Sequence, residues 1–369
     1  MAILQKMYEN TTASIRGSTA KFDVLIGCRQ GGQESPCIFN YYFDYVLKVA
    51  AHEIDRMYPD GWGIEFEYNI PHWCTNREQR SNHRMNGVEI IRWILYADDV
   101  VLFCKSVQEA ENLLNIINNT CKRFGLNISF KKTKTQVFMD EDLAKKESLL
   151  KIGEEVIDNV QQFTYLGQVI TNDVSVCFTE HRTDRAWAKF NELSTVLTDN
   201  KVNMQTRRKL LESCVRSRLI YGTQACYPKE HQMKKLEACW YGCMRSMVKG
   251  GWRRKHVPKK KKKKDVDEEE DVDYSFVYSN EQVRKIVGSQ NIKDHVNAQY
   301  LKYIGHVCRA ENNEITKIML FAKAKRAYYR DPWIKIARIL GVDQNQAKRA
   351  TQSRKEFAEL VRKSTNKSP

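Results

Sequence analysis

Two adjacent carboxylates, Asp98 and Asp99, stand between two short apolar, β-branched runs, Val88 to Ile94 and Val100 to Phe103. This pattern predicts a β-hairpin with acids at its turn. Neighbouring carboxylates disfavour each other's ionisation, and a hard divalent cation relieves that cost. Because successive side chains of a strand point to opposite faces, we expect Asp98 to bind such a cation directly and Asp99 to support it. An ordinary exposed β-turn is the alternative interpretation of this pair.

A second candidate site is the glycine-containing segment before Ser35 and Pro36. Gly31 and Gly32 remove side chains at a place where a nucleic-acid strand could approach the backbone. Gln30 offers both a hydrogen-bond donor and an acceptor. The segment therefore suits contact with a polar ligand, and a plain glycine loop before a helix is the alternative.

These two features belong to a set of four motifs that follow one another at domain-like spacing. The motifs are Gly27 to Pro36, Tyr96 to Asp99, Phe124 to Lys134, and Phe163 to Gly167. Together they resemble the palm-domain motifs of reverse transcriptases of non-LTR (LINE-type) retrotransposons. The resemblance covers roughly residues 1 to 250, and Tyr303 to Arg309 looks like a segment that follows the thumb in such elements.

The resemblance implies an RNA-directed DNA polymerase that uses two Mg²⁺ (or Mn²⁺) ions. Asp98 and Asp99 would be its metal ligands, and Tyr96 would lie beside the primer terminus. Lys132 falls where such enzymes place a lysine that can donate a proton to the departing pyrophosphate. A solvated lysine is the alternative for this position. The implied partners are an RNA template, a DNA primer and a deoxynucleoside triphosphate.

The remaining motifs are similar to nucleotide-binding and primer-binding surfaces. Arg29, Gln30 and Gly31 would lie against the template and the incoming nucleotide, and Ser35 and Pro36 would open the supporting helix. The primer grip would be formed by Tyr165, Leu166 and Gly167. Residues 182–250 would form a helical thumb that follows the duplex through its phosphates.

One family motif has no match in this sequence. A further metal-binding aspartate is expected on a strand well upstream of the Arg-Gln-Gly motif, but Asp23 lies only four residues before Gly27. The fingers and an endonuclease domain are not recognised either. We therefore expect an N-terminally truncated reverse transcriptase that holds Mg²⁺ weakly and is inactive as an isolated chain. A non-catalytic nucleic-acid-binding remnant of a retroelement is the alternative.

The composition favours a polyanionic partner, because 61 Lys and Arg exceed 45 Asp and Glu and give a net charge of +16. No apolar run is long enough to span a bilayer, and the N-terminus lacks the order of a signal peptide. We expect an intracellular protein, nuclear or cytoplasmic, that is not secreted and has no membrane partner. The scattered cysteines are expected to be reduced, and Cys239 and Cys243 to be packed thiols instead of half a metal site.

The elements that must position these residues predict an α+β fold. Helices are expected at residues 36–56, with Ser35 as N-cap, and at 107–124, ended by Gly125. Residues 58–86 read as a loop or insertion, and residues 182–248 are helical almost throughout. The fold expected is a partial polymerase palm, an antiparallel sheet with packed helices, followed by helices.

Four segments are predicted along the chain: a partial palm at 1–175, a helical thumb at 176–250, a charged low-complexity linker at 251–280 and a basic helical C-terminal region at 281–369. The linker joins six lysines, Lys259 to Lys264, to seven acids. It is expected to be solvated, with a nuclear-import signal as the functional alternative. Residues 301–369 hold 16 Lys and Arg against 6 Asp and Glu, which favours nucleic-acid contact.

Overall fold

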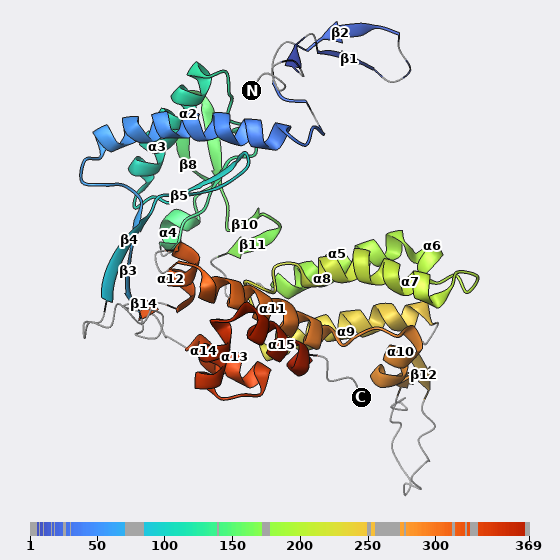
Figure 1. Cartoon of the computed structure of the whole chain (residues 1–369). Helices are drawn as coiled ribbons and strands as arrows, with labels where there is room; N and C mark the ends of the chain where they lie inside the picture. Colours follow the sequence, from blue (N-terminus) through green and yellow to red (C-terminus); the bar gives the residue numbers. More distant parts are fainter. Residues whose placement is uncertain are drawn as a thin grey trace, which may run out of the picture. The chain divides into compact units, whose positions relative to one another are not determined.

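The structure is a computed structural model that describes residues 6, 8–9, 11–15, 17, 19–24, 27–29, 31–70, 85–138, 140–171, 178–248, 252–254, 274–276, 278–311, 314–321, 323–324 and 331–365 (Figure 1). Contacts divide the chain into two compact units. Unit 1 comprises Met1–Phe66 and Val88–Gln161, and unit 2 comprises Glu67–Gly87 and Gln162–Pro369. Both units combine helices with small, mostly antiparallel sheets, so the predicted α+β class is confirmed.

Unit 1 is built from short strands around two long helices, and the unit boundary falls within β3 and β4. Its elements in chain order are β1 (Thr12–Ser14), β2 (Lys21–Asp23), α2 (Ser35–Met57), β3 (Ile64–Ile70), β4 (Met85–Ile91), β5 (Trp93–Tyr96), β6 (Asp99–Leu102), α3 (Val107–Arg123), β7 (Lys134–Thr135), α4 (Glu141–Ala144), β8 (Ser148–Ile152) and β9 (Glu155–Asn159). Strands β5 and β6 form a hairpin, while β7, β9 and β8 form a separate three-stranded sheet.

The main core of unit 1 lies between α2 and α3. Buried side chains of α2, among them Val46 and Ile54, meet Leu113 and Ile117 of α3. The two helices also share this core with Trp93 of β5. A second core joins α3 to the β8–β9 sheet. Burial of one apolar stripe on each helix therefore fixes the base of the β5–β6 hairpin.

The two predicted helices of unit 1 are confirmed, but the predicted cap of the first is wrong. Glu34 occupies the N-cap position of α2, and Ser35 is already the first helical residue. The buried Ser35 hydroxyl instead donates a hydrogen bond to the backbone carbonyl oxygen of Arg29 at 2.7 Å. Ser35 thus ties the glycine-containing segment to the helix. Helix α3 ends as predicted, with Gly125 at a φ of 72°.

Residues 58–86 are not all loop, because Ile64–Ile70 forms strand β3. Apolar and polar residues alternate along this strand, which is the pattern of a half-buried strand. The glycines and prolines around it obscured that signal in the sequence. Strand β4 begins at Met85, and residues 71–84 lie outside the described part of the chain.

Unit 2 is mainly helical, as predicted for residues 182–248. Its elements are β10 (Gln162–Tyr165), β11 (Gln168–Thr171), α5 (Phe178–Glu192), α6 (Ser194–Leu197), α7 (Met204–Leu210), the π-helix η3 (Leu211–Arg216), α8 (Ser217–Ile220), α9 (Glu230–Met247), β12 (Trp252–Arg254), β13 (Tyr274–Phe276), α10 (Asn280–Val287), α11 (Ile292–Arg309), α12 (Ile315–Phe321), β14 (Lys323–Ala324), α13 (Pro332–Leu340), α14 (Gln344–Thr351) and α15 (Arg354–Thr365). Most of the predicted linker, residues 255–273 above all, lies outside the described residues.

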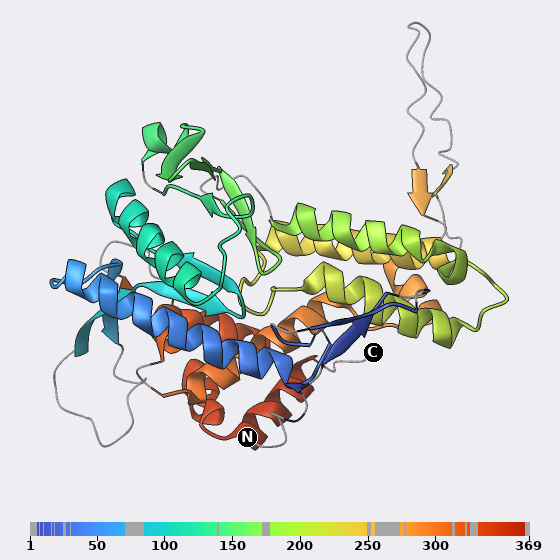
Figure 2. The ribbon, with the colours of Figure 1, turned by 90° about the horizontal axis from the view of Figure 1, so that it is seen from above.

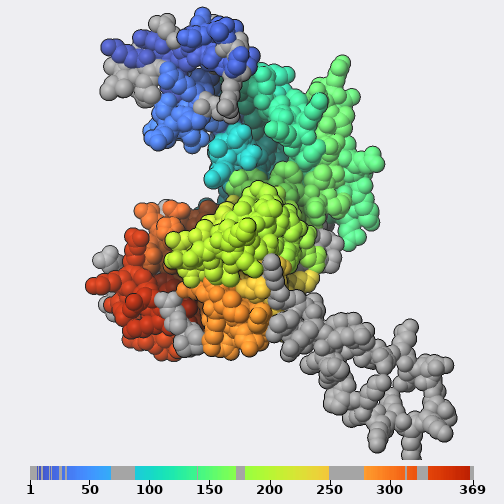
Figure 3. Space-filling view, turned by 90° about the vertical axis from the view of Figure 1, so that its right-hand side faces the viewer, coloured from blue at the N-terminus to red at the C-terminus, as the bar shows by residue number. Residues whose placement is uncertain are grey.

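Two apolar cores organise these helices. The first joins α5, α9 and the continuous α7–η3–α8 helix, and α5 runs alongside α9 in both ribbon views (Figures 1 and 2). The second is built from α11 to α15, whose orange and red atoms are contiguous in Figure 3. Buried Cys239 and Cys243 belong to the first core and are free thiols, as expected. Among the described helices, none combines the length and apolarity that crossing a membrane requires.

Candidate functional site

The candidate metal-binding residues lie at the tip of the β5–β6 hairpin. Tyr96 and Asp99 form the last antiparallel pair, so Ala97 and Asp98 make a two-residue turn. Ala97 has a φ of 53°, the left-handed conformation that tight hairpin turns require and that a non-glycine residue rarely adopts. Both carboxylates are exposed, and the Tyr96 ring is 61% exposed beside them. The predicted turn is confirmed, and it presents two carboxylates and an aromatic ring to solvent.

A buried carboxylate links the end of this hairpin to the segment before β3. Glu109 of α3 accepts hydrogen bonds from the backbone amides of Gly63, at 3.1 Å, and of Lys105, which follows β6. The backbone of Gly63 lies close to β4, because a Cβ atom added at Gly63 would be only 2.6 Å from the carbonyl oxygen of Ile91. Burial and the Glu109 charge raise the pKa of Cys104 to about 12. Glu109 is thus a positioning residue that the sequence patterns did not reveal.

Two tryptophans complete this support. Trp62 is fully buried and donates from Nε1 to Asp55 Oδ1 at 3.0 Å. Its ring meets that of Trp93 edge to face, with centroids 5.2 Å apart. Because Trp93 opens β5, the hairpin is anchored by an aromatic contact as well as by Glu109.

The glycine-containing segment is held by residues near the N-terminus. Arg29 donates to Thr11 Oγ1 at 3.3 Å, and its guanidinium carbon lies 5.4 Å from the ring centroid of Tyr8. The Tyr8 hydroxyl donates to Glu34 at 3.2 Å. Gly31 is exposed, with a φ of 85° that favours glycine. Gln30 lies outside the described residues.

Lys132 is exposed in a turn after α3, with its backbone amide bonded to Ser129 O at 3.0 Å. This turn is fixed by Ile128, which contacts the same core as Trp93. The neighbouring Lys134 forms an ion pair with Asp158 of β9. One core therefore positions α2, the hairpin that carries the carboxylates and the segment that leads to Lys132.

The predicted primer-grip residues form the turn of the β10–β11 hairpin in unit 2. Leu166 and Gly167 have positive φ values of 46° and 76°. Tyr221 donates from its hydroxyl to the carbonyl oxygen of Leu166 at 3.0 Å, and Arg182 donates to the carbonyl oxygen of Gly167. The Arg182 guanidinium carbon lies 4.8 Å from the Tyr221 ring centroid. The turn is therefore clasped by two side chains, here called the Arg182–Tyr221 clasp.

The clasp combines a buried cation with a partly exposed tyrosine ring. Arg182 is 2% exposed, and burial, followed by the neighbouring Arg185, lowers its pKa. The Tyr221 ring and the carbonyl oxygen of Gly167 compensate the buried guanidinium. The sequence patterns did not reveal either residue, because neither lies within a family motif.

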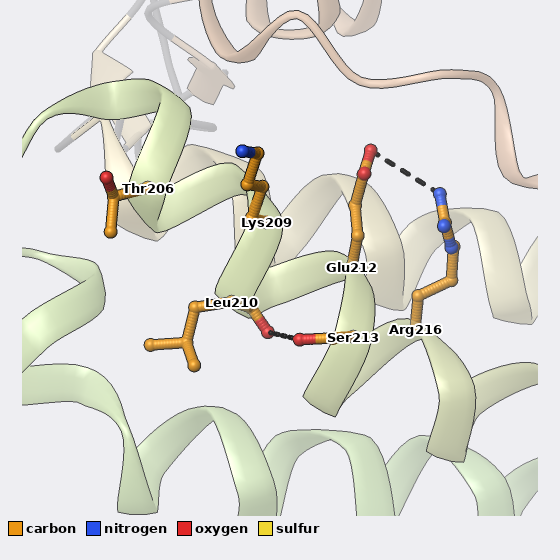
Figure 4. Close-up of a pocket in the computed structure, with 6 residues that line it drawn as sticks. All are labelled: Thr206, Lys209, Leu210, Glu212, Ser213 and Arg216. Carbon is orange, nitrogen blue, oxygen red and sulfur yellow. Dashed lines mark hydrogen bonds and ion pairs between the residues drawn. The ribbon is translucent and has the colours of Figure 1, made fainter.

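A shallow groove marks the α7–η3 helix of unit 2 (Figure 4). It is lined by Thr206, Lys209, Leu210, Glu212, Ser213 and Arg216. Lys209, Glu212 and Arg216 point to the same side, and Glu212 forms an ion pair with Arg216 at 3.4 Å. A π-helical turn within an α-helix frequently accompanies a functional site. The hydroxyl and cationic groups that line the groove suit contact with phosphate oxygens.

The donor set at the hairpin fits magnesium in kind, because Asp98 and Asp99 supply carboxylate oxygens. Within the described residues, however, no group of three or more His, Cys, Asp or Glu side chains is arranged to hold a metal ion. Unit 1 contains the carboxylates, Lys132 and the described residues of the glycine-containing segment, whereas Tyr165, Leu166 and Gly167 belong to unit 2.

Comparison with known proteins finds matches to part of this chain. Residues 1–170 match the family "Reverse transcriptase (RNA-dependent DNA polymerase)". A transposon-derived protein of Caenorhabditis elegans is 31% identical over 143 residues, which are 38% of this chain and 50% of that protein. The chain thus covers about half the length of this curated relative. No solved structure gives a significant match. These findings support a retroelement reverse transcriptase.

Proposed function

We propose that this chain is part of an RNA-directed DNA polymerase of a non-LTR retroelement. The proposal rests on the position of the two carboxylates within the segment that matches a known family. Residues 1–170 match the reverse transcriptase family, and within them Asp98 and Asp99 stand at the exposed turn of a hairpin. A hairpin turn that exposes two carboxylates to solvent suits a site that must bind both substrate phosphates and metal ions.

Asp98 would ligate the metal directly, and Asp99 would support it. When bound, the ions would activate the primer 3′ hydroxyl and neutralise charge on the triphosphate. The exposed Tyr96 ring would lie against the terminal base pair of the primer. Lys132 would hold the proton that the leaving pyrophosphate takes up, a role that suits an exposed ammonium group on a fixed turn.

Contacts to nucleic acid would extend along unit 2. The turn at Leu166 and Gly167 offers backbone where the primer strand would lie, and the Arg182–Tyr221 clasp keeps that backbone in its left-handed conformation. Lys209 and Arg216 of the groove would contact phosphates. Such contacts hold a duplex without reading its sequence.

A second candidate is a non-catalytic nucleic-acid-binding protein derived from a retroelement. It is favoured by the number of candidate metal ligands, since the described residues provide no third side chain for a metal site at the hairpin. Mg²⁺ held by two exposed carboxylates, without substrate phosphates, binds weakly. Both candidates predict binding to a primer–template hybrid, and only the first predicts chemistry.

Primer extension separates the two candidates. An oligo-dT primer on poly-rA, with labelled dTTP and Mg²⁺, is offered to the 369-residue chain and to the chain joined to the fingers and upstream palm strand of a related element. We expect the chain to bind the hybrid without extending it and the joined protein to extend it. A joined protein that binds but never extends would favour the second candidate. Robust extension by the 369 residues alone would show that the metal site has been misread, and absence of binding would contradict both candidates.

A further inference from the structure

Residues 332–351 form two helices joined by a three-residue turn. Helix α13 ends at Gly341, whose φ is 70° and whose amide donates to Ala337 O at 2.9 Å. Helix α14 begins after Asp343, whose carboxylate accepts from the amide of Gln346 at 2.9 Å. Both ends of the turn are therefore capped, which fixes the direction in which α14 leaves α13.

The inner faces of the two helices have a core of their own. Six buried apolar side chains carry it: Trp333, Ile336, Ala337, Leu340, Ala347 and Ala350. They meet Phe357 and Val361 of α15 and side chains of α11. The small side chains of α14 let it lie close to its neighbours, and the Arg309 guanidinium donates to the carbonyl oxygen at its last residue, Thr351, at 3.3 Å. Helix α14 is thus held rigidly by one face.

The exposed residues of α14 are rich in amide and cationic groups. Gln344, Asn345 and Arg349 are exposed at relative positions i, i+1 and i+5, with the half-buried Lys348 between them at i+4. Asn and Gln can donate and accept together toward adenine, and Arg and Lys donate toward guanine. The 35 residues from 331 to 365 carry eight Lys and Arg against four Asp and Glu, which suits a polyanion.

We propose that α13 and α14 form a helix-turn-helix that places α14 in the major groove of double-stranded DNA and reads its sequence. The turn of three residues with a glycine is characteristic of this motif, in which the second helix contacts base edges through residues near its start. Gln344 and Asn345 would read bases, and Arg349 would contact a base or phosphate. Duplex RNA is not the ligand, because its major groove is too deep and narrow for a helix. The site needs no polymerase activity and is independent of the function proposed above.

Selection from a random duplex DNA library by the full chain tests the proposal, without divalent metal and at a salt concentration that suppresses non-specific binding. We expect a short sequence to be enriched. Gln344→Ala combined with Asn345→Ala should change or abolish that sequence and lower affinity for the selected duplex about 10-fold or more per lost contact. Arg56→Ala, which removes an exposed charge at the end of α2, should leave the enriched sequence unchanged.

Two further measurements make the outcome decisive. Arg349→Lys keeps the charge but loses the planar guanidinium that can donate two parallel hydrogen bonds to one base. A change in the enriched sequence at one position would support a base contact by Arg349. An unchanged sequence with unchanged affinity would assign Arg349 to a phosphate, and the Gln344 and Asn345 variants would then decide the proposal. Binding to a poly-rA/oligo-dT hybrid should be equal for all variants, which separates this site from the polymerase surface. The proposal is overturned if no sequence is enriched, if the double variant enriches the same sequence, or if duplex RNA binds as well as the selected DNA.

Discussion

The hydroxyl of Tyr221 donates to the backbone carbonyl of Leu166 at 3.0 Å, and Leu166 holds the left-handed φ of 46° that a leucine seldom adopts. The two residues are 55 positions apart in the sequence, so a side chain that follows α8 stabilises a turn that local preferences do not favour. A turn that depends on a tertiary contact should loosen when that contact is removed.

Tyr221→Phe tests this dependence. The variant keeps the ring under Arg182 and loses only the hydrogen bond, which should cost about 0.5–1.5 kcal/mol. We expect faster hydrogen exchange of the β10–β11 amides and weaker binding of a primer–template hybrid. Tyr41→Phe, at a tyrosine that is 82% exposed, is the matched control and should change neither. Unaltered exchange in Tyr221→Phe would mean that the turn is stable by itself.

Glu109→Gln tests the buried carboxylate beneath the β5–β6 hairpin. Glu109 accepts two backbone hydrogen bonds, whereas a glutamine amide offers one acceptor atom and turns an NH₂ group toward the second donor. The free energy of unfolding should fall by about 1–3 kcal/mol, as measured by urea denaturation. Glu111→Gln on the same helix should change it by less than about 0.5 kcal/mol. Equal effects of the two substitutions would contradict the positioning role.

The sequence predicted the elements whose signals are local. The acids at the β5–β6 turn, the amphipathic pattern of α2 and α3 and the glycine at position 125 each carry their own information, and the structure has a turn, two helices and a helix end at these places. Strand β3 was missed because prolines and glycines on either side outweighed its alternating pattern. The sequence predicts Ser35 as a cap because its side chain can bond locally, but Ser35 is already helical and its hydroxyl donates to the carbonyl oxygen of Arg29 in the preceding segment.

Residues that support the candidate site were not predictable from the sequence. Glu109 looks like one more acid near the start of an amphipathic helix, and of its two backbone partners one precedes β3 and the other follows β6. Arg182 and Tyr221 meet only because α5 and the end of α8 are brought together by the core of unit 2. Such contacts depend on tertiary packing, which leaves no periodic signal in a single sequence.

Acidification should destabilise unit 2 through His295. Burial, followed by the charges of Arg216 and Lys302, lowers its pKa from 6.5 to about 4. Between these pH values the unfolded chain binds a proton that the folded chain excludes, so the free energy of unfolding falls as the pH decreases from about 7 toward 4. Because the side chain is only partly buried, we expect a loss of roughly 1–3 kcal/mol. Urea denaturation at several pH values should show this loss in the wild type and a smaller one in His295→Asn; identical pH dependence would refute the role of His295.

Lys209→Ala tests the groove on the α7–η3 helix. If Lys209 contacts a phosphate, affinity for a primer–template hybrid should fall, and the slope of log affinity against log salt should become shallower by about one unit. Lys151→Ala, which removes an exposed charge from β8 in unit 1, should leave the slope unchanged. Asp98→Ala should hardly alter binding. A slope that Lys209→Ala does not change would exclude the groove from the nucleic-acid surface.

The role of Asp98 in catalysis is measured most directly by single-turnover extension with the joined protein described above. Asp98→Asn keeps the size of the side chain and removes the charge that a metal ion needs, so the rate of nucleotide addition should fall by a factor on the order of 10³, about 4 kcal/mol of transition-state stabilisation. Asp60→Asn, an exposed aspartate elsewhere in unit 1, is the matched control and should extend the primer at the parental rate. An Asp98→Asn protein that extends the primer as fast as the Asp60→Asn control would show that the hairpin turn is not catalytic.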